Sequence, residues 1–299
     1  SHFPVRRPSM FLRIVAVIFP VFAVVALGYW YGRVKKPDMK FANQLNMEIF
    51  VPALVFSALA SKSFEIESYW LLAVGGTIVV LGSGLLAWPV GRLLGIDSRI
   101  FVPPMMFNNS GNMGLPLAIL AFGEEALPAA VMLFLVGNTL HYSLGTWMMS
   151  PNARILMLWK EPVIAASIAG LLVSVLKIEV WAPLYFAIDM VGDVSIPLLL
   201  FSLGVRLTQA DFSDVKLGVI GGVLCPLTGL IFAALCVWLL PLSPEHTAML
   251  IVFGALPPAV LSFVFAEKYG LQPQRVASLV MMGNLMSLIF VPMALYWVL

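Results

Sequence analysis

Hydrophobic residues in this chain form long runs, and charged residues or clusters of Pro and Gly separate one run from the next. An apolar stretch of roughly 20 residues is long enough to cross about 30 Å of hydrocarbon as an α-helix. The pattern therefore predicts ten membrane-spanning helices. Their expected ranges are 11–32, 41–60, 68–93, 100–121, 126–149, 159–176, 183–205, 215–240, 246–266 and 274–298.

Composition agrees with this pattern. Of the 299 residues, 61% are hydrophobic and 11% are charged, whereas soluble domains carry about 25% charged residues. The sequence therefore predicts an all-α membrane protein that lies in a lipid bilayer and has no separate soluble domain. The net charge of +2, without a basic run, argues against nucleic acid as a partner. Residues 1–9 are polar and precede Met10, so we expect an unstructured remnant ahead of a native start.

Lys and Arg in the loops predict the orientation, because they are enriched on the cytoplasmic side of a membrane. If the N-terminus is outside, the inner side holds twelve of the 17 Lys and Arg, and the outer side holds five. The inner set is Arg33, Lys35, Lys36, Lys40, Arg92, Arg99, Arg154, Lys160, Arg206, Lys216, Lys268 and Arg275; the outer set is Arg6, Arg7, Arg13, Lys62 and Lys177. We therefore expect both termini outside.

The two cysteines give no sign of a disulfide or a cofactor. Cys225 and Cys236 are eleven residues apart on one predicted helix, a separation of about 16 Å along its axis. That is too far for a disulfide, and the spacing is not that of a metal site. We expect no metal and no other cofactor.

The two halves of the chain resemble each other. Residues 48–57, EIFVPALVFS, align with residues 193–202, DVSIPLLLFS, at a shift of 145, so that Glu48 meets Asp193. The pair Gly137-Asn138 aligns with Gly283-Asn284 at a shift of 146. This predicts two five-helix repeats, 10–150 and 151–299. Because five is an odd number, the second repeat must enter the membrane inverted, as in many secondary transporters.

Two predicted spans contain helix breakers at matching positions. Span four carries FNNSGNMGLPL at residues 107–117, and we expect Pro116, with its nearby glycines, to break it. Span nine carries Pro257-Pro258. Broken backbone at membrane depth is tolerated where it lines a cavity or is buried in protein. The N-terminal ends of two half-helices would favour an anion there, and Asn108, Asn109 and Asn112 add amide groups.

These motifs resemble those of a known family. The stretches NSGNMGLPL (109–117), ALPPAVLSFVFAEKYG (255–270) and NMEIFVPALVF (46–56) are similar to helices four, nine and two of the auxin efflux carrier family, which lies within the broader bile acid/sodium symporter-like superfamily. The resemblance covers residues 10–299. It implies ten helices in a 5+5 inverted repeat, with broken helices four and nine crossing each other. It also implies a scaffold domain of helices one, two, six and seven, a transport domain that moves by an elevator mechanism, and a homodimer formed through the scaffold.

The resemblance also implies a substrate class. Spans five and six are separated by about ten residues, so the long cytoplasmic loop of the plant members is absent, and the chain looks like a bacterial, inner-membrane member. The implied substrates are small organic anions, either malonate- or malate-type dicarboxylates or auxin-like acids. The implied transport is secondary-active or driven by the membrane potential, and no enzymatic activity is expected.

The same resemblance implies a set of substrate-binding residues. Asn109 is expected to contact the substrate carboxylate, and Val51, Pro52 and Phe56 to form the scaffold wall, although packing alone would also explain those three. The remaining members of the implied anion site are Ser110, Asn112, Pro116, Pro257 and Pro258.

A second set of residues is a candidate for ion coupling or for support of the site. Glu48 and Asp193 lie within predicted spans, where a charge costs about 2.5–3.5 kcal/mol. Each either carries a coupling proton or binds a cation, or else lies hydrated near a cavity mouth or caps a neighbouring helix. Asn138 and Asn284 either support the site or join helices. His141 either titrates near neutral pH or is a hydrogen-bonded structural residue.

Two departures from the pattern of the family bear on the coupling ion. Span three carries no charge apart from Arg92, whereas the third helix of the plant members carries an ionised support site. The LPPAV break lacks the acidic residue that sodium-coupled relatives have there. Coupling to protons or to the membrane potential is therefore favoured over sodium.

Two alternative functions stay open. They are a cation or proton exchanger of similar fold and a sensor that retains the fold without transport.

Overall fold

The chain is described here from a computed structural model covering residues 9–61, 64–150, 160–209 and 214–299. In these ranges the chain is helical, with no β-strand and one isolated bridge. Residues 1–8 of the expected N-terminal remnant and residues 151–159, which comprise most of the loop between spans five and six and the first residue of span six, lie outside the described residues. The prediction of an all-α membrane protein is confirmed.

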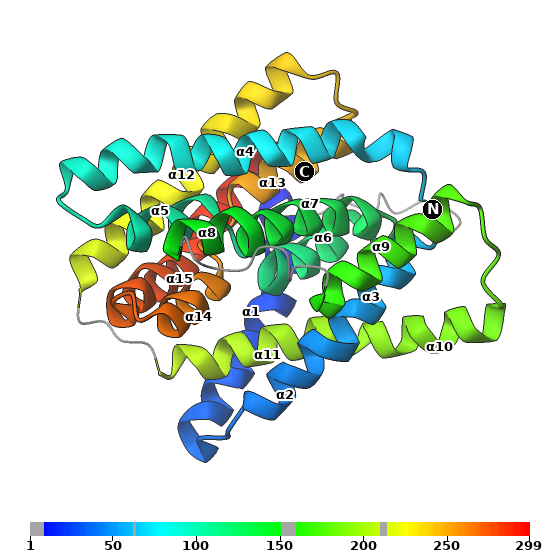
Figure 1. The fold of residues 1–299 in the computed structure, drawn as a ribbon, viewed down its shortest axis with the longest axis horizontal. Coiled ribbons are helices and arrows are strands. Elements are labelled where there is room, and N and C mark those ends of the chain that lie inside the picture. The colour runs from blue at the N-terminus through cyan, green and yellow to red at the C-terminus, as the bar shows by residue number, and fades with distance from the viewer. Residues whose placement is uncertain (1–8, 62–63, 151–159, 210–213) are drawn as a thin grey trace, which may run out of the picture.

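The first half of the chain, to Ser150, is made of these elements (Figure 1): α1 (Met10–Lys35), α2 (Lys40–Leu45), π-turn η1 (Asn46–Phe50), α3 (Val51–Leu59), α4 (Ile66–Leu93), α5 (Ser98–Met106), π-turn η2 (Ser110–Gly114), α6 (Leu115–Phe122), 3₁₀-turn η3 (Glu124–Ala126), α7 (Leu127–Leu140), π-turn η4 (His141–Gly145) and α8 (Thr146–Met149). The second half is made of α9 (Pro162–Val175), α10 (Ala182–Asp193), α11 (Ser195–Leu207), α12 (Val215–Leu239), α13 (Pro244–Gly254), α14 (Val260–Tyr269) and α15 (Pro273–Val298).

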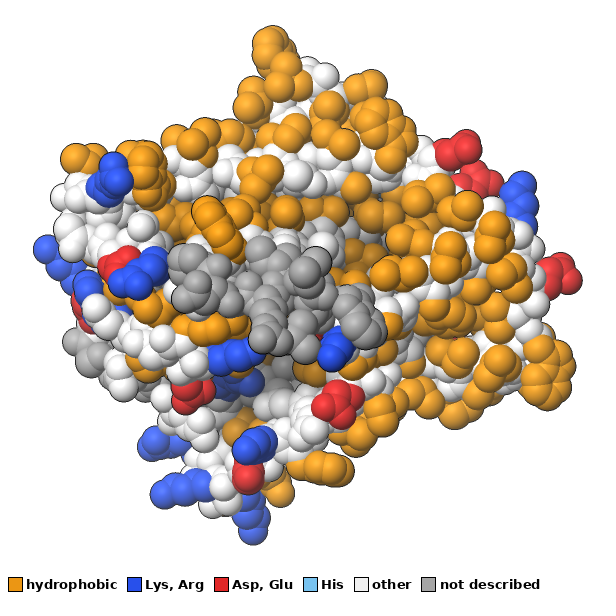
Figure 2. Space-filling model, viewed as in Figure 1, with side chains coloured by type: hydrophobic (Ala, Val, Ile, Leu, Met, Phe, Trp, Pro, Cys, Tyr) orange, Lys and Arg blue, Asp and Glu red, His pale blue; other side chains and the backbone are white. Residues whose placement is uncertain are grey.

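Six helical stretches in the described part of the chain are long and apolar enough to cross a membrane by themselves: Met10–Lys35, Ile66–Leu93, Glu124–Met149, Ala182–Leu207, Val215–Leu239 and Pro273–Val298. Three of the other predicted spans consist of shorter helices that follow one another, such as α5 and α6 or α13 and α14, and predicted span 159–176 contains the shorter apolar helix α9. Long exposed side chains such as Phe19, Trp181 and Phe186 suit a surface in contact with lipid. Figure 2 shows hydrophobic side chains covering much of the right half of the molecule, with Lys and Arg gathered at the left and lower left.

Local sequence signals fix several helix ends. The side chains of Ser9, Asp97, Asp214 and Ser243 each accept a hydrogen bond from a backbone N–H in the first turn of the following helix. Helix α14 ends at Gly270, whose φ of 66° is a left-handed conformation that glycine adopts without steric cost. These caps satisfy backbone groups that a helix end would otherwise leave unpaired.

Small residues let the helices pack closely. α1 lies against α11, and α3 lies against α9 and α10 (Figure 1). A Cβ at Gly28 of α1 would be 2.1 Å from the carbonyl oxygen of Phe201, and a Cβ at Gly204 of α11 would be 2.0 Å from that of Val25. Membrane helices associate through this kind of close backbone approach, because lipid offers apolar surfaces as good as those of another helix.

We expect Gly204→Ala to destabilise the protein, because the new methyl group meets backbone atoms that no rotamer change can move. The cost should be about 1–3 kcal/mol, which lowers the melting temperature of the detergent-solubilised protein by roughly 2–4 °C per kcal/mol. Gly137→Ala is the matched control, since its Cβ would come no closer than 3.6 Å to Ser110 Oγ. Equal melting temperatures for the two variants would contradict the close packing of α1 on α11.

Candidate functional site

The first break in the helices lies between α5 and η2, at residues 107–109. Phe107 is extended, with φ −103° and ψ 111°, and the helix resumes at Ser110. The prediction that Pro116 breaks this span is therefore wrong: Pro116 is buried near the start of α6. The wider π-turn of η2 directly before α6 accommodates the ring of Pro116, which would clash with the carbonyl four residues earlier in a regular α-helix.

The second break lies between Gly254 and Val260 and includes Pro257 and Pro258, as the sequence predicts. Here two consecutive prolines lack backbone donors, and the chain remains non-helical until α14 begins.

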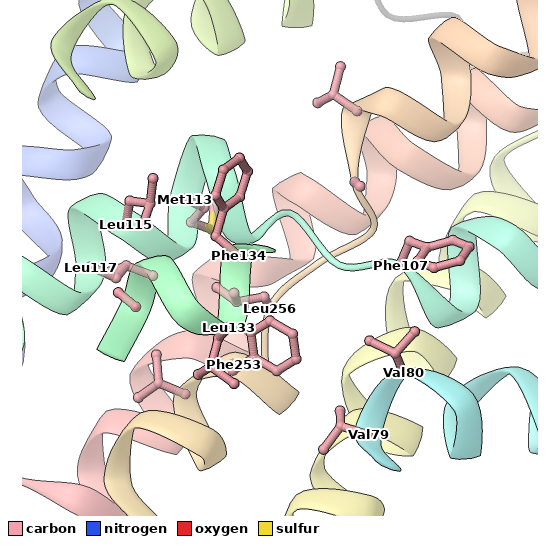
Figure 3. Packing of buried hydrophobic residues seen from close by; sticks show 14 of the residues in the cluster. Val79, Val80, Phe107, Met113, Leu115, Leu117, Leu133, Phe134, Phe253 and Leu256 are labelled. Atoms are coloured by element: carbon pink, nitrogen blue, oxygen red, sulfur yellow. The ribbon is translucent and has the colours of Figure 1, made fainter. Parts of the chain in front are cut away.

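The two broken segments cross and bond to each other. The backbone N–H of Asn109 donates to the carbonyl of Pro257 at 2.7 Å, and that of Ala259 donates to the carbonyl of Phe107 at 2.8 Å. Asn108 and Pro258 form an isolated antiparallel bridge. Figure 3 shows the two extended segments passing each other, with Phe107 on one side of the crossing and Leu256 and Phe253 on the other.

Side-chain amides hold this crossing in place. Asn284 of α15 accepts a hydrogen bond from Asn109 Nδ2 at 2.8 Å, and its own Nδ2 donates to the carbonyls of Pro258 at 3.1 Å and Val280 at 2.8 Å. A Cβ at Gly283 would be 2.4 Å from Cδ of Pro258, so only glycine lets α15 come this close. The Gly283-Asn284 pair thus positions both broken segments.

Both half-helices begin at the crossing. The helical stretch 110–122 starts directly after Asn109, and α14 starts directly after Ala259. The first backbone N–H groups of a helix have no partner within it, and its N-terminus carries about half a positive charge. Two such ends at one place favour an anion.

A cavity of about 750 Å³ lies against these helix ends. Such a volume is within the range of about 300–1,000 Å³ typical of small-molecule sites. It extends from the crossing to the exposed residues Asp38 and Lys40. Residues of α2, η1, η2, α7, α11 and α14 line it. The predicted site residues that line it are Val51, Asn109, Ser110, Asn112, Asn138 and His141.

Other predicted residues lie outside the lining of this cavity. Pro257, Pro258 and Asn284 are behind the crossing, where they build it. Pro52, Phe56 and Pro116 pack in the helices. His141 lines the cavity but is only 2% exposed, and its ring stacks on that of Phe107 with centroids 4.1 Å apart. The distance from His141 Nε2 to Ser262 Oγ is 3.3 Å. These contacts give it a structural role in addition to any titration.

The two carboxylates that the sequence places within predicted spans lie away from the crossing. Glu48 accepts a hydrogen bond from Gln44 Nε2 at 2.9 Å and lines a second cavity of about 550 Å³ with Tyr142 and Glu161. Asp193 ends α10, is exposed, and lines neither cavity. Among the described residues, no group of three or more His, Cys, Asp and Glu side chains could hold a metal ion.

Sequence reasoning missed the polar residues that α11 and η1 contribute to the lining of the cavity. Ser202 and Arg206 of α11 line the cavity, and so does Asn46 of η1. Ser202 Oγ, Asn46 Oδ1 and Asn108 Oδ1 are buried and have no hydrogen-bond partner among the described residues. The i, i+4 spacing of Ser202 and Arg206 places them on one helix face. That spacing is visible in the sequence, but it does not show which surface the face meets.

Asn284→Ala should destabilise the protein more than the same change at its repeat partner, Asn138. The first variant leaves the Asn109 amide and the Pro258 carbonyl unpaired in a buried place, at a cost of roughly 2 kcal/mol or more. The side chain of Asn138 has no hydrogen bond to the described residues, so its variant should cost about 1 kcal/mol or less. Melting temperatures of the two purified variants measure the difference. Equal losses would mean that the amide contacts do not hold the crossing.

Comparisons with known proteins find relatives along most of the chain. A family model described as membrane transport protein matches residues 13–158 and 153–296. The chain is 26% identical over 309 residues to a putative malonate transporter of Rhizobium meliloti, covering 95% of each chain. It is 24% identical over 297 residues to an uncharacterized transporter of Methanocaldococcus jannaschii, covering 92% of this chain and 96% of that one. Auxin efflux carrier component 6 of Arabidopsis thaliana is 26% identical over 178 residues, covering 57% of this chain and 29% of that one.

Proposed function

Because the chain belongs to the membrane transport protein family, we propose that it is a secondary transporter of small organic anions that bind by a carboxylate at the helix crossing. The observation that carries the proposal is that two half-helix N-termini and the side chains of Asn109, Ser110 and Asn112 meet one cavity. Similarity to a putative malonate transporter supports the same substrate class.

The chemistry of the crossing suits reversible binding of an anion. Backbone N–H groups, hydroxyls and amides donate hydrogen bonds to a carboxylate without adding a full positive charge. At the crossing itself, partial charges would bind the carboxylate without the desolvation cost of a fully buried ion pair, which suits a substrate that has to be released again. The Asn109 amide is already held by Asn284, which orients it for a substrate without rearrangement.

The packing supports an elevator motion of two domains. α1 lies on α11, and α3 lies on α9 and α10; these helices with α2 would form the scaffold. α4 to α8 and α12 to α15 would carry the crossing. Each half of the chain thus packs its first helix on the second span of the other half, as an inverted repeat requires. The cavity lies along the boundary between these two groups.

We also propose the orientation and the energy source. Asp38 and Lys40, at the mouth of the cavity, belong to a loop that Lys and Arg predict to be cytoplasmic, so the cavity would face the cytoplasm, with both termini outside a bacterial inner membrane. Transport would be driven by protons or by the membrane potential rather than by sodium. Exposed apolar side chains of α9 and α10, such as Leu172 and Phe186, would face lipid or a second copy of the scaffold.

Asn112→Asp should abolish binding of carboxylates while leaving the fold intact. Asn112 is half-buried, lines the cavity and has no side-chain hydrogen bond to the described residues, so the change breaks no contact. A carboxylate in the first helical turn is stabilising for the helix but repels an anionic substrate. The measurement is the thermal shift of the purified protein with acetate, malonate and indole-acetic acid, followed by uptake of the stabilising acid into proteoliposomes. A ligand at about a hundred times its dissociation constant stabilises the folded state by roughly 2.7 kcal/mol.

Asn43→Asp provides the matched control, because Asn43 lines the same cavity near its mouth, away from the crossing. It should keep most of the thermal shift, whereas Asn109→Ala should lose it. If Asn112→Asp and Asn109→Ala both respond to acids as the wild type does, carboxylates do not bind at the crossing and the proposed site is wrong.

A further inference from the structure

The lining of the cavity includes a positive charge on α11 that has no hydrogen bond or ion pair with the described residues. Arg206 lies in the last turn of α11, lines the cavity and is half-buried. It makes no hydrogen bond and no ion pair with the described residues. A half-buried guanidinium without a partner is unusual, because its desolvation is normally offset by a carboxylate or a carbonyl.

A second unpaired group lies one turn away on the same face. Ser202 is 7% exposed, lines the cavity, and its Oγ has no hydrogen-bond partner among the described residues. Leu199 and Leu203 line the cavity from the same helix and are buried. The face of α11 is therefore apolar except for one hydroxyl and one guanidinium, both of which donate hydrogen bonds.

We propose that Arg206 and Ser202 form a second anion-binding pole, which binds the distal carboxylate of a short dicarboxylate while the crossing binds the first. This inference rests on the proposed function and narrows it from organic anions to dianions. A guanidinium offers two parallel N–H groups that match the two oxygens of a carboxylate. Arg206 would therefore be a specificity-determining residue in the wall that faces the transport domain.

The charges in the cavity match a dianion better than a monoanion. The two half-helix ends contribute about half a positive charge each, and the guanidinium contributes one more, so the cavity offers about two positive charges. Glu267 of α14 also lines the cavity and interacts electrostatically with Arg206, but it is exposed. At the mouth, Asp38 and Lys40 are both exposed and carry opposite charges. Glu267 offsets part of the total, and solvent screens exposed charges more strongly than half-buried ones.

The test compares two ligands that differ by one charge, malonate and monomethyl malonate, by thermal shift and by competition for uptake. We expect Arg206→Gln to weaken malonate binding by about tenfold or more, because a charge-assisted hydrogen-bonded pair is lost. The binding affinity for monomethyl malonate should change by less than about threefold. Ser202→Ala should weaken malonate selectively but to a smaller extent. Arg206→Lys keeps the charge and removes the planar guanidinium. Its affinity for malonate should lie between those of the wild type and Arg206→Gln, and it replaces Arg206→Gln in the test if that variant does not fold.

Two controls separate this pole from other effects. Arg33→Gln makes the same change at an exposed arginine of α1 that does not line the cavity, and should leave both ligands unchanged. Glu267→Gln should leave malonate binding unchanged or strengthen it, because it removes a negative charge that offsets Arg206. If Glu267→Gln weakens malonate binding as much as Arg206→Gln does, the charge of Arg206 does not explain the loss and the inference is wrong.

The remaining outcomes distinguish the two proposals. If Arg206→Gln weakens the binding of malonate and of its monoester equally, or weakens neither, Arg206 does not bind the second carboxylate. The proposed binding of acids at the crossing would still stand. If the wild type binds neither ligand and no other carboxylate, the proposed function fails, and the second pole fails with it.

Discussion

The structure depends on one constraint, the need to satisfy backbone hydrogen bonds where two apolar helical stretches are interrupted. Hydrocarbon offers no water to an unpaired N–H or carbonyl, and each such group costs several kcal/mol, about 4–8 by transfer to an apolar solvent. The chain meets this cost by crossing the two interruptions, so that Asn109 donates to Pro257 and Ala259 donates to Phe107. Asn284 then satisfies the carbonyl of Pro258.

The crossing also leaves the starts of two half-helices beside one cavity. The first N–H groups of these half-helices have no partner in a preceding turn, and residues at both helix starts line the cavity. In the proposed function, the interruption that would be a defect in an ordinary helix provides donors for an anion. Close packing by Gly283 and the Asn109–Asn284 hydrogen bond keep these donors in a fixed position, so that binding requires little reorganisation.

Much of the organisation could be predicted from the sequence. Length and composition of the apolar runs determine an all-α membrane protein, because lipid permits few other ways to pair the backbone. Pro257-Pro258 marks a break because two consecutive donors are missing. The asparagines near residue 109 could be assigned to the cavity because amides in an apolar span need partners or water. The match of Gly137-Asn138 with Gly283-Asn284 identified a pair of important positions, but not the difference between them.

Only the tertiary structure decided how these residues meet. Pro116 looked like the break in span four, yet the break lies at residues 107–109, because its partners are backbone groups of a segment about 150 residues away. Asn284 braces the crossing whereas Asn138 lines the cavity, since neighbouring helices differ although the local sequence is alike. Arg206 counted as a loop charge in the sequence but faces the cavity. The sequence by itself determined that the chain is apolar enough for a lipid environment and which residue types the candidate site contains. Packing decided the direction in which each helix face points, because it brings together residues that no local pattern connects.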